Sequence, residues 1–199
     1  MILIIDNYDS FSYNLVQVIG TVIKKRNVEE TIKDVFIKVV RNDEITIEEI
    51  KKLHPSHIIL SPGPGRPKDA GICETLIKEL YMEYKILGVC LGHQAICETF
   101  GATISYAKQL MHGKQSQVSL SKDCKLFEGL DKNQIVARYH SLIATEESIP
   151  TTLQIIAMDE RKQVMGVRYK GYDVYGLQFH PESVLTPNGA KMIENFLYL

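Results

Sequence analysis

The chain has 199 residues, of which 45% are hydrophobic and 24% charged, and its formal net charge is −1. This composition is typical of a folded globular protein, and the charge balance argues against a nucleic-acid surface or an acidic tail. The apolar start at residues 1–5 is too short for a signal peptide, and no stretch approaches transmembrane length. We therefore expect one domain over residues 1–199, in the cytoplasm, that binds neither nucleic acid nor a membrane.

Apolar segments alternate with helical patterns in the first hundred residues. Strands are predicted at residues 1–5, 35–40, 57–60 and 86–89, and helices follow them at 11–23, 47–53, 72–80 and 92–100. This order predicts a parallel sheet with helices on both faces. Residues 20–34 form a long, charged link, in which Asn27 and Glu30 have the spacing of a capping pair and favour a short extra helical turn.

After Gly101 the pattern changes to strand-like segments. They occur at residues 103–107, 117–120, 135–139, 153–158, 164–169 and 174–179. Turn residues separate several of them, so we expect antiparallel strands added to the sheet. A closing helix is predicted from about Thr186, with Pro187 in its first position. The predicted fold class is α/β, a flavodoxin-like open, mostly parallel sheet with helices on both faces and additional antiparallel strands in the C-terminal half.

The most informative stretch is a G-x-C-x-G pattern formed by Gly88, Cys90 and Gly92, between an apolar strand and a helix. It is the thiol counterpart of the nucleophile elbow, in which small neighbours leave room for a strained turn. The turn would place the sulfur at a helix N-terminus, which favours the thiolate, and would aim the N–H of Leu91 at an oxyanion. The alternative is an ordinary core cysteine, since free cysteine is among the most buried residue types.

The other cysteines, Cys73, Cys97 and Cys124, form no C-x-x-C pair with one another or with Cys90. This spacing disfavours a zinc site or a thioredoxin-type redox site. We interpret the three as structural free thiols in a reducing compartment, and we expect no metal and no cofactor in this chain.

A nucleophilic cysteine needs a base and a group that orients the base. Of the six histidines, His180 is the best placed, because it follows the last predicted strand. Residues two apart in an extended segment point the same way, so Glu182 could accept the other ring N–H of His180. The alternative is a solvated loop. His54 and His57 are interpreted as structural or surface residues, and His93 as a packing residue.

The loop at residues 61–67 follows the strand predicted at 57–60, so it lies at the same sheet edge as the elbow. Ligands bind at this edge in open α/β sheets. Gly63 and Gly65 leave backbone N–H groups free, and one of them could be a second oxyanion donor.

Together these residues resemble the class I (triad) glutamine amidotransferases, and in particular the glutaminase components of anthranilate synthase and aminodeoxychorismate synthase. Matching blocks occur in the family's order at residues 6–11, 61–65, 88–94, 139–142 and 179–183. His112, Gly113 and Lys114 resemble a block of the chorismate-pathway members. The link at residues 20–34 is longer than is usual in the family and contains no motif.

The resemblance implies a role for each matching residue. Cys90 would be the nucleophile, His180 its base and later the general acid, and Glu182 the group that orients the imidazole. The N–H groups of Leu91 and Gly63 would form the oxyanion hole. The residues that would bind glutamine are Gly63, Pro64, Gly65, Leu91, Gln94, Ser141 and Leu142.

The resemblance also implies a reaction and a partner. The chain would hydrolyse L-glutamine to glutamate and ammonia, and would deliver the ammonia to a chorismate-aminating synthase subunit in a hetero-oligomer. That subunit would be Mg²⁺-dependent, and its binding would raise glutaminase activity. Whether the final product is anthranilate, aminodeoxychorismate or both stays open. Two alternatives are a stand-alone thiol hydrolase, such as a γ-glutamyl hydrolase, and a non-catalytic module that regulates a synthase.

Overall fold

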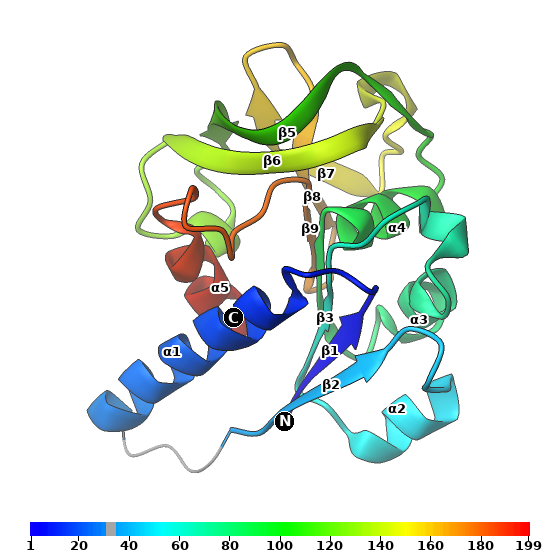
Figure 1. Cartoon of the computed structure of the whole chain (residues 1–199), viewed down its shortest axis with the longest axis vertical. Helices are drawn as coiled ribbons and strands as arrows, with labels where there is room; N and C mark the ends of the chain where they lie inside the picture. The colour runs from blue at the N-terminus through cyan, green and yellow to red at the C-terminus, as the bar shows by residue number, and fades with distance from the viewer. Residues whose placement is uncertain (31–34) are drawn as a thin grey trace.

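In the part of the chain that the structure describes, the strands form one nine-stranded sheet with the order β2-β1-β3-β4-β9-β8-β7-β5-β6 (Figure 1). The computed structural model describes residues 1–30 and 35–199, and among these it leaves out the side chains of residues 26–30 and 108–112. The strands are β1 (Ile2–Asp6), β2 (Ile37–Arg41), β3 (His57–Leu60), β4 (Lys85–Val89), β5 (Ile104–Leu120), β6 (Asn133–Ala144), β7 (Leu153–Asp159), β8 (Val164–Tyr169) and β9 (Val174–Leu177). The α-helices are α1 (Ser12–Glu30), α2 (Ile47–Leu53), α3 (Cys73–Leu80), α4 (Leu91–Thr99) and α5 (Gly189–Leu197).

The sheet has a parallel half and an antiparallel half that meet at β9. Strands β2, β1, β3, β4 and β9 pair in parallel, whereas β9-β8, β8-β7, β7-β5 and β5-β6 pair antiparallel. The carboxyl ends of β1, β3, β4 and β9 therefore lie at one edge of the sheet. Both the parallel sheet and the antiparallel addition confirm the fold class predicted from the sequence.

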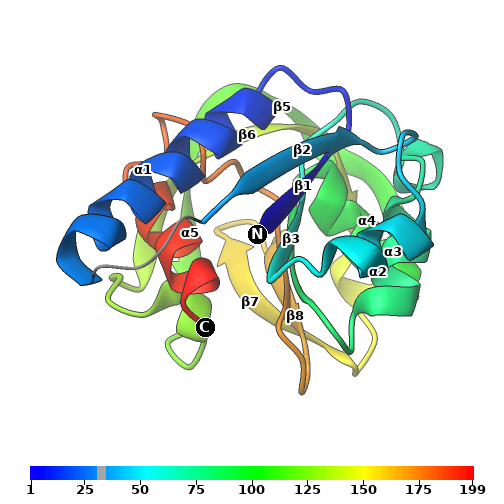
Figure 2. The same cartoon turned by 90° about the horizontal axis from the view of Figure 1, so that it is seen from below.

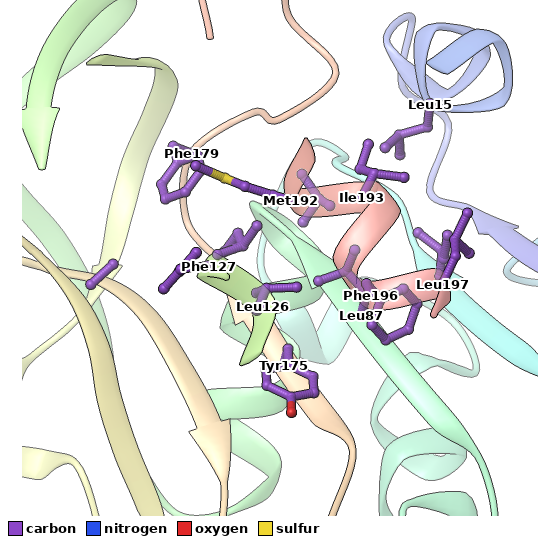
Figure 3. Packing of buried hydrophobic residues seen from close by; sticks show 14 of the residues in the cluster. Leu15, Leu87, Leu126, Phe127, Tyr175, Phe179, Met192, Ile193, Phe196 and Leu197 are labelled. Atoms are coloured by element: carbon purple, nitrogen blue, oxygen red, sulfur yellow. The ribbon is translucent and has the colours of Figure 1, made fainter. Parts of the chain in front are cut away.

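Helices cover both faces of the parallel half (Figure 2). Successive residues of β1 point to opposite faces: Ile2 and Ile4 pack in the cluster that contains α1 and α5, while Leu3 and Ile5 pack against α2, α3 and α4. Figure 3 shows the first cluster, in which α5 contributes Met192, Ile193, Phe196 and Leu197. Both faces of β1 are thus buried, as is typical of a strand inside a parallel sheet.

Several element boundaries differ from the prediction, most clearly at α1, β5 and α5. Helix α1 runs without a break from Ser12 to Glu30, so Asn27 lies inside it and does not begin a separate turn. The side chains of the predicted capping pair, Asn27 and Glu30, and residues 31–34 of the link lie outside the described part of the chain. Residues 104–120 form one strand, β5, although the sequence predicted two strands there. The pairing of β5 with β6 is irregular after Tyr106 and after His112.

The closing helix begins at Gly189, and Pro187 lies before it instead of in its first position. Thr186 is used elsewhere: its Oγ1 donates to the carbonyl of His180 at 2.7 Å and accepts from the N–H of Ala137 at 2.9 Å. A side chain on Gly189 would collide with the carbonyl oxygen of Pro181. Across the part of the chain that the structure describes, no helix has the length and apolar content needed to cross a bilayer.

Candidate active site

Cys90 occupies the turn between β4 and α4 and has φ 52° and ψ −99°, a region that side-chain-bearing residues rarely adopt. Its two neighbouring glycines make this turn possible. A Cβ on Gly88 would collide with the carbonyl of Gly92, and a Cβ on Gly92 would lie 2.6 Å from the carbonyl oxygen of Leu60. Strain of this kind costs about 1–3 kcal/mol and is typical of functional sites.

His180 and Glu182 follow β9 and form a buried pair. The distance between Nδ1 of His180 and Oε1 of Glu182 is 2.7 Å, and the two residues are 2% and 4% exposed. The imidazole lies edge-on to the rings of Phe11 and Tyr139, with centroid distances of 5.6 and 5.0 Å. These contacts fix the plane of the ring, while Glu182 fixes its rotation.

The electrostatics of this pair include Cys90. Burial lowers the pKa of His180, but the nearby Cys90 and the hydrogen bond and charge of Glu182 outweigh it and raise that pKa to about 10. Nε2 of His180 and Oε2 of Glu182 are buried and have no hydrogen-bond partner among the described residues. Ring nitrogen Nε2 of His180 is therefore available to exchange a proton with a neighbouring group.

The loop after β3 lies against the elbow. A Cβ on Gly63 would lie 2.8 Å from Cδ2 of Leu91 and 2.5 Å from Cβ of Asn7, so only glycine fits this close approach. No other described residue accepts a backbone hydrogen bond from Gly63 or Leu91. Pro64 and Gly65 are exposed, and Gly65 has φ 81°.

The remaining predicted residues lie behind and beside the sulfur. Nε2 of Gln94 donates to the carbonyl of Leu142 at 2.9 Å and to Oε1 of Gln178 at 3.1 Å. Ser141 and Leu142 belong to β6, with Ser141 exposed and Leu142 buried. The carbonyl of Leu142 also contacts Nδ1 of His140 at 3.1 Å, so both of its lone pairs are occupied.

The other cysteines are buried away from this chemistry. Burial raises the pKa of Cys73 to about 12 and also raises the pKa values of Cys97 and Cys124. His93 is fully buried on α4, and burial lowers its pKa to about 4, which agrees with a packing residue. Among the side chains that the structure describes, no three from His, Cys, Asp or Glu are grouped so that they could hold a metal ion.

Sequence reasoning assigned no role to several residues that the structure places at the site. Gln178 contacts the sulfur of Cys90. The rings of Phe11 and Tyr139 border the imidazole of His180. Asn7 connects the loop after β1 to Ser61 through two hydrogen bonds of 2.8 Å, one from its backbone nitrogen and one from its side-chain nitrogen. Gln178 lies two residues before His180 in the segment predicted as a strand at residues 174–179, but β9 ends at Leu177, so this spacing alone does not identify its contact with Cys90.

Comparison with known proteins agrees with this architecture. Residues 3–199 match the family described as glutamine amidotransferase class-I. The chain is 44% identical to anthranilate synthase component 2 of Pseudomonas aeruginosa over 99% of this chain and 94% of that protein. It is 43% identical to aminodeoxychorismate/anthranilate synthase component 2 of Bacillus subtilis, over 99% and 95% of the two chains. It also matches about a third of a longer relative, the bifunctional protein TrpGD of Thermotoga maritima, with 46% identity and 32% of that protein covered.

A solved structure shows the same fold. A protein from Thermoplasma acidophilum that is described as part of a GMP synthase superposes with a TM-score of 0.82 at 26% identity, over 99% of this chain and 92% of that chain. The family predicted from the sequence motifs is therefore confirmed. A match of nearly the full length, with relatives above 40% identity, shows that the chain is a member of the class-I glutamine amidotransferase family.

Proposed function

We propose that this chain is the glutaminase subunit of a chorismate-aminating synthase, and that Cys90, His180 and Glu182 are its catalytic triad. The observation that carries the proposal is the strained turn at Cys90 next to the buried His180–Glu182 pair. A thiol, a base and a carboxylate that orients the base are the parts that nucleophilic amide cleavage needs.

Each step of the hydrolysis uses a group of this chain. The thiolate of Cys90 attacks the side-chain amide carbon of glutamine, and the N–H groups of Leu91 and Gly63 stabilise the oxyanion. Protonated His180 then gives its proton to the leaving nitrogen, and ammonia departs as the thioester forms. A water that His180 deprotonates cleaves the thioester, which releases glutamate and restores the thiol.

Glutamine binding is proposed for the residues around this centre. Gln94, Ser141, Leu142 and the loop at residues 63–65 would contact the amino-acid end of the substrate. The carbonyl of Leu142 already accepts from Gln94 and contacts the ring of His140, so Leu142 would contribute its other backbone atoms.

The partner is inferred from the relatives and from the chemistry of the product. Relatives that are similar over the full length are named component 2 of anthranilate synthase or of aminodeoxychorismate synthase, including one from Escherichia coli that is 41% identical and matched over its whole length. Ammonia is mostly protonated near neutral pH and is then no nucleophile, so direct transfer to a synthase subunit is favoured. The Mg²⁺ would belong to that subunit, and the complex would reside in the cytoplasm.

The test combines two variants with two synthase subunits. Cys90→Ala in the reconstituted complex should abolish glutamate release, while Cys124→Ala, which alters another buried free thiol, should retain it. Chorismate and glutamine are then supplied with either synthase partner, and the aminated product is identified. Glutamate release by Cys90→Ala at the unaltered rate would refute the triad, and full activity without any partner would refute the subunit role.

A further inference from the structure

We propose that Gln178 is a positioning residue that holds the sulfur of Cys90 in place and favours its thiolate form. The proposal rests on the proposed role of Cys90 as the nucleophile. Nε2 of Gln178 lies 3.6 Å from Sγ of Cys90, within the range of a hydrogen bond to sulfur. Gln178 is fully buried directly after β9, where its backbone N–H donates to the carbonyl of Met165 at 3.0 Å.

The orientation of the Gln178 amide follows from its neighbours. The carbonyl of Leu142 can only accept, so Gln94 must present its NH₂ group to it, at 2.9 Å. The second N–H of Gln94 then donates to Gln178, which must present Oε1, at 3.1 Å. The NH₂ group of Gln178 is thereby directed at the sulfur, and turning the amide over would place two N–H groups against each other.

A second set of groups occupies the other lone pair of the Leu142 carbonyl oxygen. Nε of Arg138 donates to Nε2 of His140 at 3.1 Å, which leaves the hydrogen on Nδ1 and directs it at the Leu142 carbonyl, 3.1 Å away. Burial and the charge of Arg138 lower the pKa of His140 to about 3, so this ring stays neutral. Arg138 itself is held by Asp159 at 2.7 Å and by Gln163 at 2.6 Å.

Gln178, Gln94, Leu142, His140 and Arg138 are all buried and joined by these hydrogen bonds, so the N–H of Gln178 has little freedom to leave the sulfur. An N–H donor stabilises S⁻ more than S–H, because hydrogen bonds to an ionised group are the stronger ones. Gln178 would therefore raise the thiolate fraction at neutral pH. It would also limit the positions from which the sulfur attacks the amide carbon.

The test measures the thiolate directly, without glutamine. Iodoacetamide alkylates thiolates, and peptide mass spectrometry follows Cys90 separately from Cys73, Cys97 and Cys124, whose burial keeps them protonated. Gln178→Met keeps the side-chain length and removes the donor. We expect its Cys90 alkylation at pH 7 to be about threefold to tenfold slower than in the natural protein, with the same plateau rate at high pH.

Two further variants complete the design. Gln178→Asn keeps an amide that is too short to contact both neighbours, and it should slow alkylation by a smaller factor. The matched control is Gln134→Met, which removes another buried amide that bonds to Asp131 and Asn188 and should leave alkylation unchanged. In the complex, kcat for glutamine should fall for both Gln178 variants, with KM within about twofold.

An unchanged rate–pH curve for Cys90 in folded Gln178→Met, or in Gln178→Asn if the first variant unfolds, would overturn the proposal. Failure of the proposed function would give a different result, because unaltered protein would then release no glutamate in the complex whatever its alkylation rate.

Discussion

The contact between His180 and Glu182 gives the sharpest prediction about catalysis. Glu182→Gln keeps the shape of the side chain and removes its charge. The altered contact is a 2.7 Å hydrogen bond between two buried groups, so solvent screens it little. Hydrogen bonds to charged groups of this kind are worth about 1.5–3 kcal/mol. If this energy is lost when the imidazolium forms, kcat should fall by roughly 10- to 150-fold at pH 7.

The assay follows glutamate release by the reconstituted complex over a range of glutamine concentrations. KM should change little, because Glu182 contacts the ring and is not among the residues proposed to bind glutamine. NMR titration of labelled histidine gives an independent reading, since the pKa of His180, raised to about 10 in part by Glu182, should fall in the variant. Glu194→Gln, which alters a partly exposed pair with Lys191, is the matched control and should behave as the natural protein.

A folded Glu182→Gln variant with kcat within twofold of the natural value would show that the carboxylate does not orient the base. A large loss of kcat with an unchanged His180 titration would refute the electrostatic reasoning, because the effect would then have another origin.

Four further outcomes are expected. Arg138→Met should lower the free energy of unfolding in urea by about 3–5 kcal/mol, because it leaves Asp159 buried without its partner, whereas Lys191→Met, at an exposed pair, should cost less than about 0.5 kcal/mol. The folded-state pKa of His180 is raised to about 10, so protonation of this ring stabilises the folded state. That stabilisation is complete below the ordinary pKa of 6.5 and is lost as the pH rises to 10, so the urea concentration at the midpoint of unfolding should fall over this range. Gly88→Ala should cost about 1–3 kcal/mol by crowding Gly92, measured in the same way. Glutamate release per chain should rise on addition of the synthase partner, and equal rates with and without it would contradict that coupling.

Local features of the sequence predicted the parts of the site that depend on local geometry. The glycines on either side of Cys90 and the two-residue spacing of His180 and Glu182 determine these contacts within a few positions of the chain, and the structure shows both arrangements. The apolar runs of the parallel strands were equally informative, because burial on both faces leaves a simple pattern.

What the sequence did not reveal depends on contacts between distant segments. Gln178 meets Gln94 across 84 positions and Cys90 across 88, and no local pattern encodes such a pairing. Thr186 has the character of a helix start, yet it lies outside α5, and its hydroxyl bonds to Ala137 in distant β6 and to His180 six residues earlier. The sequence predicted two strands within residues 103–120, and pairing with β6 on both sides of the irregular residues 107–110 joins them into one strand.

Cys90 and His180, the proposed nucleophile and base, are anchored to different halves of the sheet. The N–H of Cys90 donates to the carbonyl of Leu177 at 2.8 Å, which fixes the sulfur to the parallel strands. The N–H of His180 donates instead to the carbonyl of Ala137 in β6, at 3.0 Å. The side chain of Gln115 in β5 donates to the carbonyl of Leu185, three residues after Glu182. A shift of β6 relative to the parallel strands would therefore move the backbone of His180 relative to that of Cys90, and would change the distance between the imidazole and the sulfur.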